Sequence, residues 1–197
     1  MDIAIFGGSF NPVHMGHHEI VRNLVQNMGV SKLIIVPTYQ NPLKSLPPVI
    51  PEFIRWQMLK QTFQAFDSVE ISDFELQNQK MSYSYKTVIH YKKQYPHDHL
   101  FLILGEDTFA AFPQWAEIET ILNLSEILVF PRRQSREPES SIPFFHGFVQ
   151  HVTWLDIEVP HISATQIRNS DLKKVAEKRW LHPEAHKIWQ HYQQSLT

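Results

Sequence analysis

Six short apolar segments, separated by longer segments of helical period, most constrain how this chain can fold. The apolar segments are residues 3–6, 32–37, 68–75, 99–105, 125–130 and 152–159. Apolar residues recur at helical spacing in residues 15–28, 51–66, 83–95, 114–122 and most of 163–194. Nearly continuous apolar strands that alternate with helices are typical of a parallel sheet with both faces covered. The alternation therefore predicts an α/β fold with right-handed crossovers.

The helical segments carry their own boundary signals. Pro51 and Pro183 each stand where a first helical position is expected. One apolar face is predicted for residues 51–66, made of Phe53, Ile54, Met58, Leu59 and Phe63. Two segments read as loops: residues 37–51, which hold five prolines, and the polar residues 131–147. We expect one domain over residues 1–197, with a helical C-terminal part.

Composition excludes several classes of function. The chain has 197 residues, 43% hydrophobic and 19% charged, which is globular composition. Its net charge of -2 predicts no sequence-independent binding to nucleic acid. Because there are no cysteines, disulfides, thiolate metal sites and cysteine nucleophiles are excluded. No apolar run has the length of a membrane span. The apolar segment near the N-terminus is too short for a secretory signal, so we expect a cytoplasmic protein.

The segment GGSFNPVHMGHHEI, residues 7–20, follows the first predicted strand. In a parallel sheet, ligands bind at the carboxyl ends of the strands, and this segment occupies that place. We expect Gly7 and Gly8 to permit a tight turn and close backbone approach. His14 and His17 are three residues apart and should share a helix face, and Gly16 between them removes a side chain where a ligand could pass. With the free N–H groups of a helix start, this pattern favours a polyphosphate ligand. A glycine turn with surface histidines is the alternative.

The pattern HxGH in this position resembles the first motif of the nucleotidylyltransferase superfamily. ISATQIR, residues 162–168, resembles the second motif, ISxTxIR. Further segments are similar to bacterial nicotinate-nucleotide adenylyltransferases: LIIVPTYQNPLK, RWQML, SYSYKT, LGEDTFAAFPQW and HPEAHKIW. The resemblance implies a Rossmann-like open parallel sheet with helices on both faces and a helical C-terminal cap, residues 162–197.

The resemblance also implies an activity. The chain would transfer the adenylyl group of ATP to nicotinate mononucleotide, with nicotinamide mononucleotide as a second candidate acceptor, and release pyrophosphate in NAD biosynthesis. Mg²⁺ would bind with the ATP. Because no Lys-Ser or Lys-Thr pair follows the glycines, the nucleotide itself would hold most of the metal. The chain shows no activated nucleophile, so positioning and charge stabilisation would carry the reaction. The oligomeric state stays open.

The family motifs assign residues to each half of the predicted site. The catalytic candidates are His14, His17, Lys44 and Arg168. The nucleotide-binding candidates are Gly7, Gly8, Ser9, Phe10, Gly16, Gly105, Asp107, Ile162, Ser163 and Thr165. The acceptor-binding candidates are Ser82, Tyr83, Lys86 and Trp115. Taken alone, Ser163 and Asp107 are equally well explained as helix caps, and Trp115 as a core residue. His182 and His186 have metal-ligand spacing without a carboxylate motif, so we predict no protein-bound metal.

Three departures from the usual pattern affect a phosphate donor, an acceptor contact and the adenine-side loop. Leu43 replaces a histidine, Lys86 replaces an acid, and FPRR, residues 130–133, replaces Arg-Pro-Gly. They leave two alternatives open. One is the same chemistry with another phosphorylated acceptor, such as phosphopantetheine or a sugar or alcohol phosphate. The other is a nucleotide-binding regulatory module without turnover.

Overall fold

A computed structural model describes residues 1–77, 79–131 and 151–196. The sheet has six strands, all parallel, in the order β3-β2-β1-β4-β5-β6. The strands are β1 (Asp2–Gly8), β2 (Lys32–Pro37), β3 (Val69–Ile71), β4 (His99–Gly105), β5 (Glu126–Phe130) and β6 (Val152–Trp154). The chain reverses its direction of winding between β1 and β4, which places the topological switch point between these two strands. The predicted α/β fold is confirmed.

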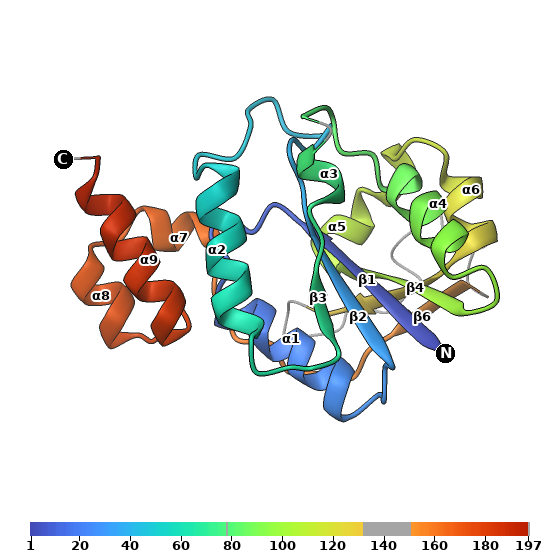
Figure 1. Cartoon of the computed structure of the whole chain (residues 1–197), viewed down its shortest axis with the longest axis horizontal. Coiled ribbons are helices and arrows are strands. Elements are labelled where there is room, and N and C mark those ends of the chain that lie inside the picture. Colours follow the sequence, from blue (N-terminus) through green and yellow to red (C-terminus); the bar gives the residue numbers. More distant parts are fainter. Residues whose placement is uncertain (78, 132–150, 197) are drawn as a thin grey trace.

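Helices cover both faces of the sheet, as Figure 1 shows. The longer ones are α1 (Met15–Gln26), α2 (Glu52–Phe63), α4 (Ser84–Gln94) and α9 (Pro183–Gln194). The shorter ones are α3 (Phe74–Gln77), α5 (Glu106–Ala110), α6 (Ile118–Leu124), α7 (Ala164–Arg168), α8 (Leu172–Glu177) and the 3₁₀ helix η1 (Phe112–Gln114). The last three α-helices stand beside α2 at one end of the molecule (Figure 1). Within the described residues, no helix combines the length and the apolar character needed to cross a membrane.

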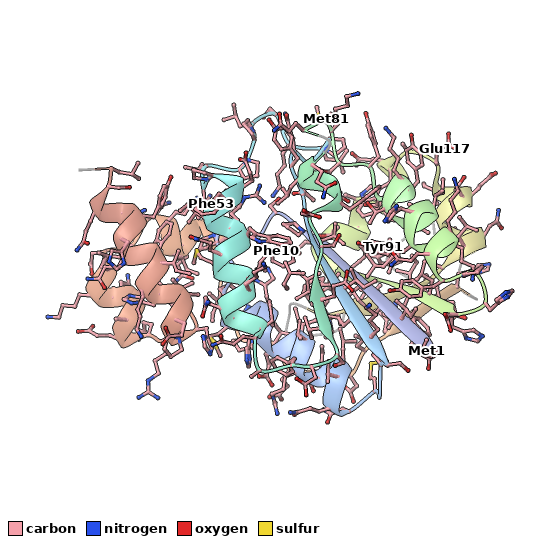
Figure 2. The ribbon with its side chains drawn as sticks, viewed as in Figure 1. Met1, Phe10, Phe53, Met81, Tyr91 and Glu117 are labelled. Carbon is pink, nitrogen blue, oxygen red and sulfur yellow. The ribbon has the colours of Figure 1, made fainter. Side chains whose placement is uncertain are left out.

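Two hydrophobic clusters follow from the alternation of side chains along each strand. Ala4 and Phe6 of β1 join the cluster that packs against α1, α2 and the C-terminal helices. Ile3 and Ile5 point to the other face and join the cluster against α4, α5 and α6. Figure 2 shows Phe10 in the interior of the molecule, and its side chain is buried in the first cluster.

Some predicted boundaries and faces were wrong. Phe53, placed on the buried face of its helix, is 63% exposed, while Met58, Leu59 and Phe63 are buried as expected. Pro51 caps α2 from outside instead of starting it. The helix expected from residue 114 begins at Ile118, because Glu117 adopts a left-handed backbone conformation with φ 57°.

The end of the sheet also differs from the prediction. The last strand ends at Trp154 instead of residue 159, as suits an edge strand with a single neighbour. The C-terminal helical region is divided into α7, α8 and α9, and Pro183 starts the last of these as expected. The predicted loop at residues 131–147 lies outside the described residues after Pro131.

Candidate active site

A cleft of about 920 Å³ opens at the carboxyl edge of the sheet, around the ends of β1 and β4. It also takes walls from the loop that leaves β2, from the start of α4 and from α7. The predicted site residues that line it are Gly7, Gly8, Ser9, Phe10, His14, His17, Lys44, Ser82, Tyr83, Gly105, Trp115, Ser163, Thr165 and Arg168. Gly16, Lys86, Asp107 and Ile162 do not line it. The structure therefore brings most of the predicted residues together at the switch point.

The turn after β1 is formed differently from the prediction. Gly7 and Gly8 belong to the strand, and neither has a positive φ. The chain turns instead at Phe10, with φ 41°, and at the cis peptide bond between Asn11 and Pro12. A Cβ atom at Gly8 would lie 3.0 Å from the Phe10 ring, whereas one at Gly7 would meet no atom within 4 Å. The missing side chain at Gly8 therefore admits the Phe10 ring, Gly7 leaves open space beside the strand, and the following residues make the turn.

His14 and His17 lie together where α1 begins, as predicted. His14 is the residue before the helix, and its ring centroid lies 3.7 Å from that of His17. The backbone N–H of His14 donates a hydrogen bond of 3.1 Å to Nδ1 of His17. Because Nδ1 accepts this bond, the proton of the neutral His17 ring is on Nε2. The His17 ring also lies 5.0 Å from the Phe10 ring, which limits its orientation.

Gly16 lies next to the His14 ring and does not line the cleft. A Cβ atom there would lie 3.0 Å from Nδ1 of His14 and 3.4 Å from the backbone oxygen of Pro160. The missing side chain thus admits the His14 ring and the segment that precedes α7. Our expectation that Gly16 gives space to a ligand is not supported by this position.

Helix α7, which carries most of the second motif, contacts the turn that leads to the first motif. Ser163 caps this helix, and its hydroxyl accepts a 3.1 Å hydrogen bond from the backbone N–H of Gln166. Arg168 donates to the hydroxyl of Thr165 at 3.1 Å and to the backbone oxygen of Asn11. The guanidinium therefore links α7 directly to the turn after β1. Ile162 packs against the hydrophobic core instead of lining the cleft.

Lys44 comes from the loop between β2 and α2, which arches over the carboxyl edge of the sheet (Figure 1). Its side chain is exposed, and Nζ lies 3.4 Å from the hydroxyl of Ser9. The neighbouring Leu43, one of the departures from the family pattern, also lines the cleft and is 46% exposed. This loop places both a cation and apolar surface at the entrance.

Arg55 supports the same region and was missed as a site residue. It is 1% exposed, and its guanidinium donates to the backbone oxygens of Ile50, Ser9 and Thr38 at 2.9–3.1 Å. Burial lowers the pKa of Arg55 to about 10, so the group stays charged at neutral pH. Only its place in the RWQML segment could have signalled this role.

The acceptor candidates line another part of the cleft. Ser82 is buried, and its hydroxyl accepts a 2.9 Å hydrogen bond from the backbone N–H of Tyr39. Tyr83 is the residue before α4. Trp115 is half-buried, and its ring lies 5.3 Å from that of Phe112. Trp115 therefore packs against the core and faces the cleft as well.

Gly105 and Asp107, the two candidates near the end of β4, differ in their position relative to the cleft. A Cβ atom at Gly105 would lie 2.9 Å from the ring of Phe130, so the close approach there is made by a side chain of this protein. Gly105, not Asp107, is the residue before α5. Asp107 is exposed within the first turn of that helix, outside the cleft. The helix-cap interpretation of Asp107 was therefore wrong.

Lys86 also lies outside the cleft. It is exposed on α4, and its amine lies 5.3 Å and 5.8 Å from the rings of Tyr83 and Tyr85. A carboxyl group that we did not predict, Glu75 of α3, lines the cleft instead. Burial raises the pKa of Glu75, although hydrogen bonds from Thr87 and Ser82 act in the opposite direction. An isolated glutamate in a short segment gave no sequence signal for this role.

Neither cleft nor surface offers a protein-held metal site in the part of the chain that the structure describes. No group of three or more His, Asp or Glu side chains there has suitable geometry. His182 is the residue before α9, and His186 lies one turn into that helix.

Comparisons with known proteins agree with this geometry. A family model described as cytidylyltransferase-like matches residues 5–170. A probable nicotinate-nucleotide adenylyltransferase of Clostridium novyi is 32% identical over 185 residues, which are 92% of each chain. One of Aliarcobacter butzleri is 41% identical over 132 residues, 67% of this chain and 72% of the relative.

Solved structures show the same fold. The nicotinic acid mononucleotide adenylyltransferase of Plasmodium falciparum, complexed with NaAD, matches with a TM-score of 0.77 and 20% identity. The match covers 97% of this chain and 95% of that one. From the length of the family match and the identity to full-length relatives, this chain belongs to the cytidylyltransferase-like family of nucleotidyltransferases, among relatives named nicotinate-nucleotide adenylyltransferases.

Proposed function

We propose that this chain transfers the adenylyl group of ATP to nicotinate mononucleotide and releases pyrophosphate. The observation that carries the proposal is the convergence of two motifs, far apart in sequence, on one cleft. His14 and His17 stand on one side, and Arg168 reaches the turn between them and β1. The curated relatives with which this chain shares most of its length are named for this activity.

In the proposed reaction, an oxygen of the mononucleotide phosphate attacks the α-phosphorus of ATP. The bond from that phosphorus to the oxygen leading to the β-phosphate breaks, and pyrophosphate leaves with the electron pair. Negative charge builds on the transferring and leaving phosphates, so donors fixed in advance lower the barrier. The Nε2–H of His17 and the guanidinium of Arg168 are such donors, because hydrogen bonds to the protein already fix each ring or fork.

Lys44 and the buried Arg55 add positive potential to the half of the cleft that is proposed to bind the ATP phosphates. Lys44 lies at the cleft entrance, where its amine is proposed to contact the β- and γ-phosphates. The Ser163–Thr165 helix start also favours phosphate at this position. Arg55 lies behind the wall and donates a hydrogen bond to the backbone oxygen of Ser9, which lines the cleft. Together these groups support a triphosphate along the turn after β1.

Mg²⁺ is expected to arrive with the ATP. Among the described residues that line the cleft, Glu75 is the acidic side chain, and its carboxyl group is buried and hydrogen-bonded to its neighbours. Phosphate oxygens and water are therefore the proposed ligands of the metal. Bound there, Mg²⁺ would neutralise charge on the β- and γ-phosphates.

The acceptor is proposed to lie across the cleft, with its ring near Trp115 and the Ser82–Tyr83 segment. A ring beside a half-buried indole gains stacking, and the hydroxyl and backbone groups at the start of α4 offer polar contacts. Lys86 is not included in this contact set, because it lies outside the cleft.

A panel of acceptors tests the proposal. The purified chain is incubated with ATP, Mg²⁺ and one of nicotinate mononucleotide, nicotinamide mononucleotide, phosphopantetheine or a sugar phosphate, and pyrophosphate release is followed. We expect the highest kcat/KM with nicotinate mononucleotide. A higher value with phosphopantetheine or a sugar phosphate would reject the acceptor, and ATP binding without any release would favour a regulatory module.

A further inference from the structure

Glu75 brings a carboxyl group to the wall of the acceptor half, yet only 7% of the residue is exposed. It lies on α3, the short helix that follows β3. A carboxylate at such a place is unexpected if the acceptor itself carries a carboxylate, because two like charges in a low-dielectric site repel each other. The contacts of Glu75 show how the fold resolves this conflict.

Two hydroxyl groups hold the carboxyl group in place. Thr87 donates to Oε1 at 2.5 Å, and Ser82 also forms a hydrogen bond with the carboxyl group. Ser82 in turn accepts from the backbone N–H of Tyr39, in the loop after β2. Because Ser82 and Thr87 flank the first turn of α4, Glu75 fixes the orientation of the segment that we assign to the acceptor.

The second carboxyl oxygen has no such support. Oε2 of Glu75 is fully buried and has no hydrogen-bond partner among the described residues. An ionised carboxylate with one oxygen unsolvated and unpaired is costly, whereas the protonated acid carries no net charge. The direction of the pKa shift agrees, since burial raises the pKa of Glu75.

The ionisable groups around Glu75 come from α4 and from the start of α3. Tyr91 has its pKa raised to about 12 and stays neutral. The His90 ring stacks on the phenylalanine beside Glu75, and the amine of Lys86 lies over the rings at the start of α4. Asp73 is exposed to solvent.

We propose that Glu75 is a positioning and specificity-determining residue whose protonated form lets the cleft take an acceptor with a carboxylate on its ring. This inference rests on the proposed adenylyl transfer. Binding of nicotinate mononucleotide is then linked to retention or uptake of one proton by Glu75. Binding of nicotinamide mononucleotide, whose ring carries an uncharged amide, is not linked in this way. Raising the pH therefore shifts the preference from the nicotinate towards the nicotinamide form.

The test compares kcat/KM for the two mononucleotides from about pH 5 to pH 9, a window that spans the pKa values of buried carboxyls. In the wild type, the nicotinate-to-nicotinamide ratio should fall as pH rises. The fall should be about tenfold for each unit by which a bound carboxylate raises the pKa of Glu75. Glu75→Gln, which keeps the shape and removes the charge, should give a flat ratio that stays at the low-pH value.

Two control variants separate this effect from others. Glu126→Gln removes an exposed carboxyl at the amino end of β5, away from the cleft, and should leave the pH profile unchanged. His90→Asn removes the neighbouring imidazole and should also retain the fall. A flat wild-type ratio, or an identical fall in Glu75→Gln, would overturn the inference even though adenylyl transfer is intact. Failure of both mononucleotides as acceptors would instead reject the proposed function.

Protein stability gives a readout that needs no substrate. Because the folded pKa of Glu75 is raised, its stabilising contribution is complete below the unfolded pKa and is lost as pH rises through the folded pKa. Glu75→Gln should therefore gain stability relative to the wild type as pH increases. A difference between the two proteins that does not change with pH would show that Glu75 is ionised throughout, and would overturn the inference.

Discussion

The two halves of the cleft are built from opposite chemistry. The phosphate half gathers His14, His17, Lys44 and Arg168, with the buried Arg55 beneath them. The acceptor half is built from hydroxyl groups, aromatic rings and one buried carboxyl whose raised pKa favours its neutral form. The contrast matches the proposed substrates, because the triphosphate needs cationic donors while the acceptor ring needs a site without fixed negative charge.

The largest expected effect concerns the phosphate half. His17→Ala removes a donor whose orientation is fixed through Nδ1, and turnover should fall by about 10²–10³. Circular dichroism and thermal unfolding should show an intact fold. His191→Ala, an exposed histidine in the last turn of α9, serves as the control and should keep full turnover. Unchanged turnover in His17→Ala would remove this residue from the proposed mechanism.

Substitution of Arg55 tests whether the phosphate half depends on the hydrogen bonds that this buried side chain donates to the backbone. Arg55→Met leaves the backbone oxygens of Ser9, Thr38 and Ile50 without their donor, and should lower the free energy of unfolding by about 2–4 kcal/mol. Denaturant unfolding measures this loss. Lys60→Met, on the exposed side of the same helix, should change it little. Equal effects of the two substitutions would refute the proposed stabilising role of the Arg55 hydrogen bonds.

Arg168 tests the connection between the two motifs. Arg168→Met should reduce kcat/KM by about 10- to 100-fold, since charged hydrogen bonds of this kind contribute about 1.5–3 kcal/mol. Arg168→Lys should recover only part of the loss, because an amine cannot reproduce the fork that contacts Thr165 and Asn11. Initial rates with ATP in excess and at limiting concentration separate binding from turnover. Full activity in the lysine variant would contradict the proposed geometry.

The smallest expected effect is a loss of stability at acidic pH, caused by protonation of His18 in α1. Burial and the nearby His182 lower the pKa of His18 from 6.5, so its stabilising contribution is present above that value and is lost as pH falls through the folded pKa. The melting temperature should therefore decline as the solution is acidified from about pH 7 to pH 5. His18→Phe keeps an aromatic ring beside Phe63 and Phe66 and should reduce this decline. An equally steep decline in the variant would assign the acid sensitivity to other groups.

The two halves also differ in how far the sequence predicted them. His14 and His17 are held by a contact between residues three apart, and Arg168 ends the short helix that Ser163 caps, so both sets appear as compact motifs. Glu75 acquires its role from burial and from Thr87 and Ser82, which no local pattern encodes. Lys86 lies outside the cleft for the complementary reason, since a position in the motif does not determine which helix face lines the cleft.

The fold was predictable for similar physical reasons. Continuous apolar strands and periodic helices gave the order of the major elements. The short helices α3 and α5 were missed, because four or five residues are too few to show a period. The backbone turn at Phe10 was also missed, since a positive φ at phenylalanine is disfavoured and is imposed by the surrounding structure.

The central claim is that a triphosphate in the cationic half delivers its α-phosphorus to an acceptor in the neutral half. Its most direct test follows a label on the α-phosphate of ATP, with Mg²⁺ and nicotinate mononucleotide present. The account predicts that the label appears in the dinucleotide while unlabelled pyrophosphate is released. Label that stays in ATP or appears only in AMP would contradict it.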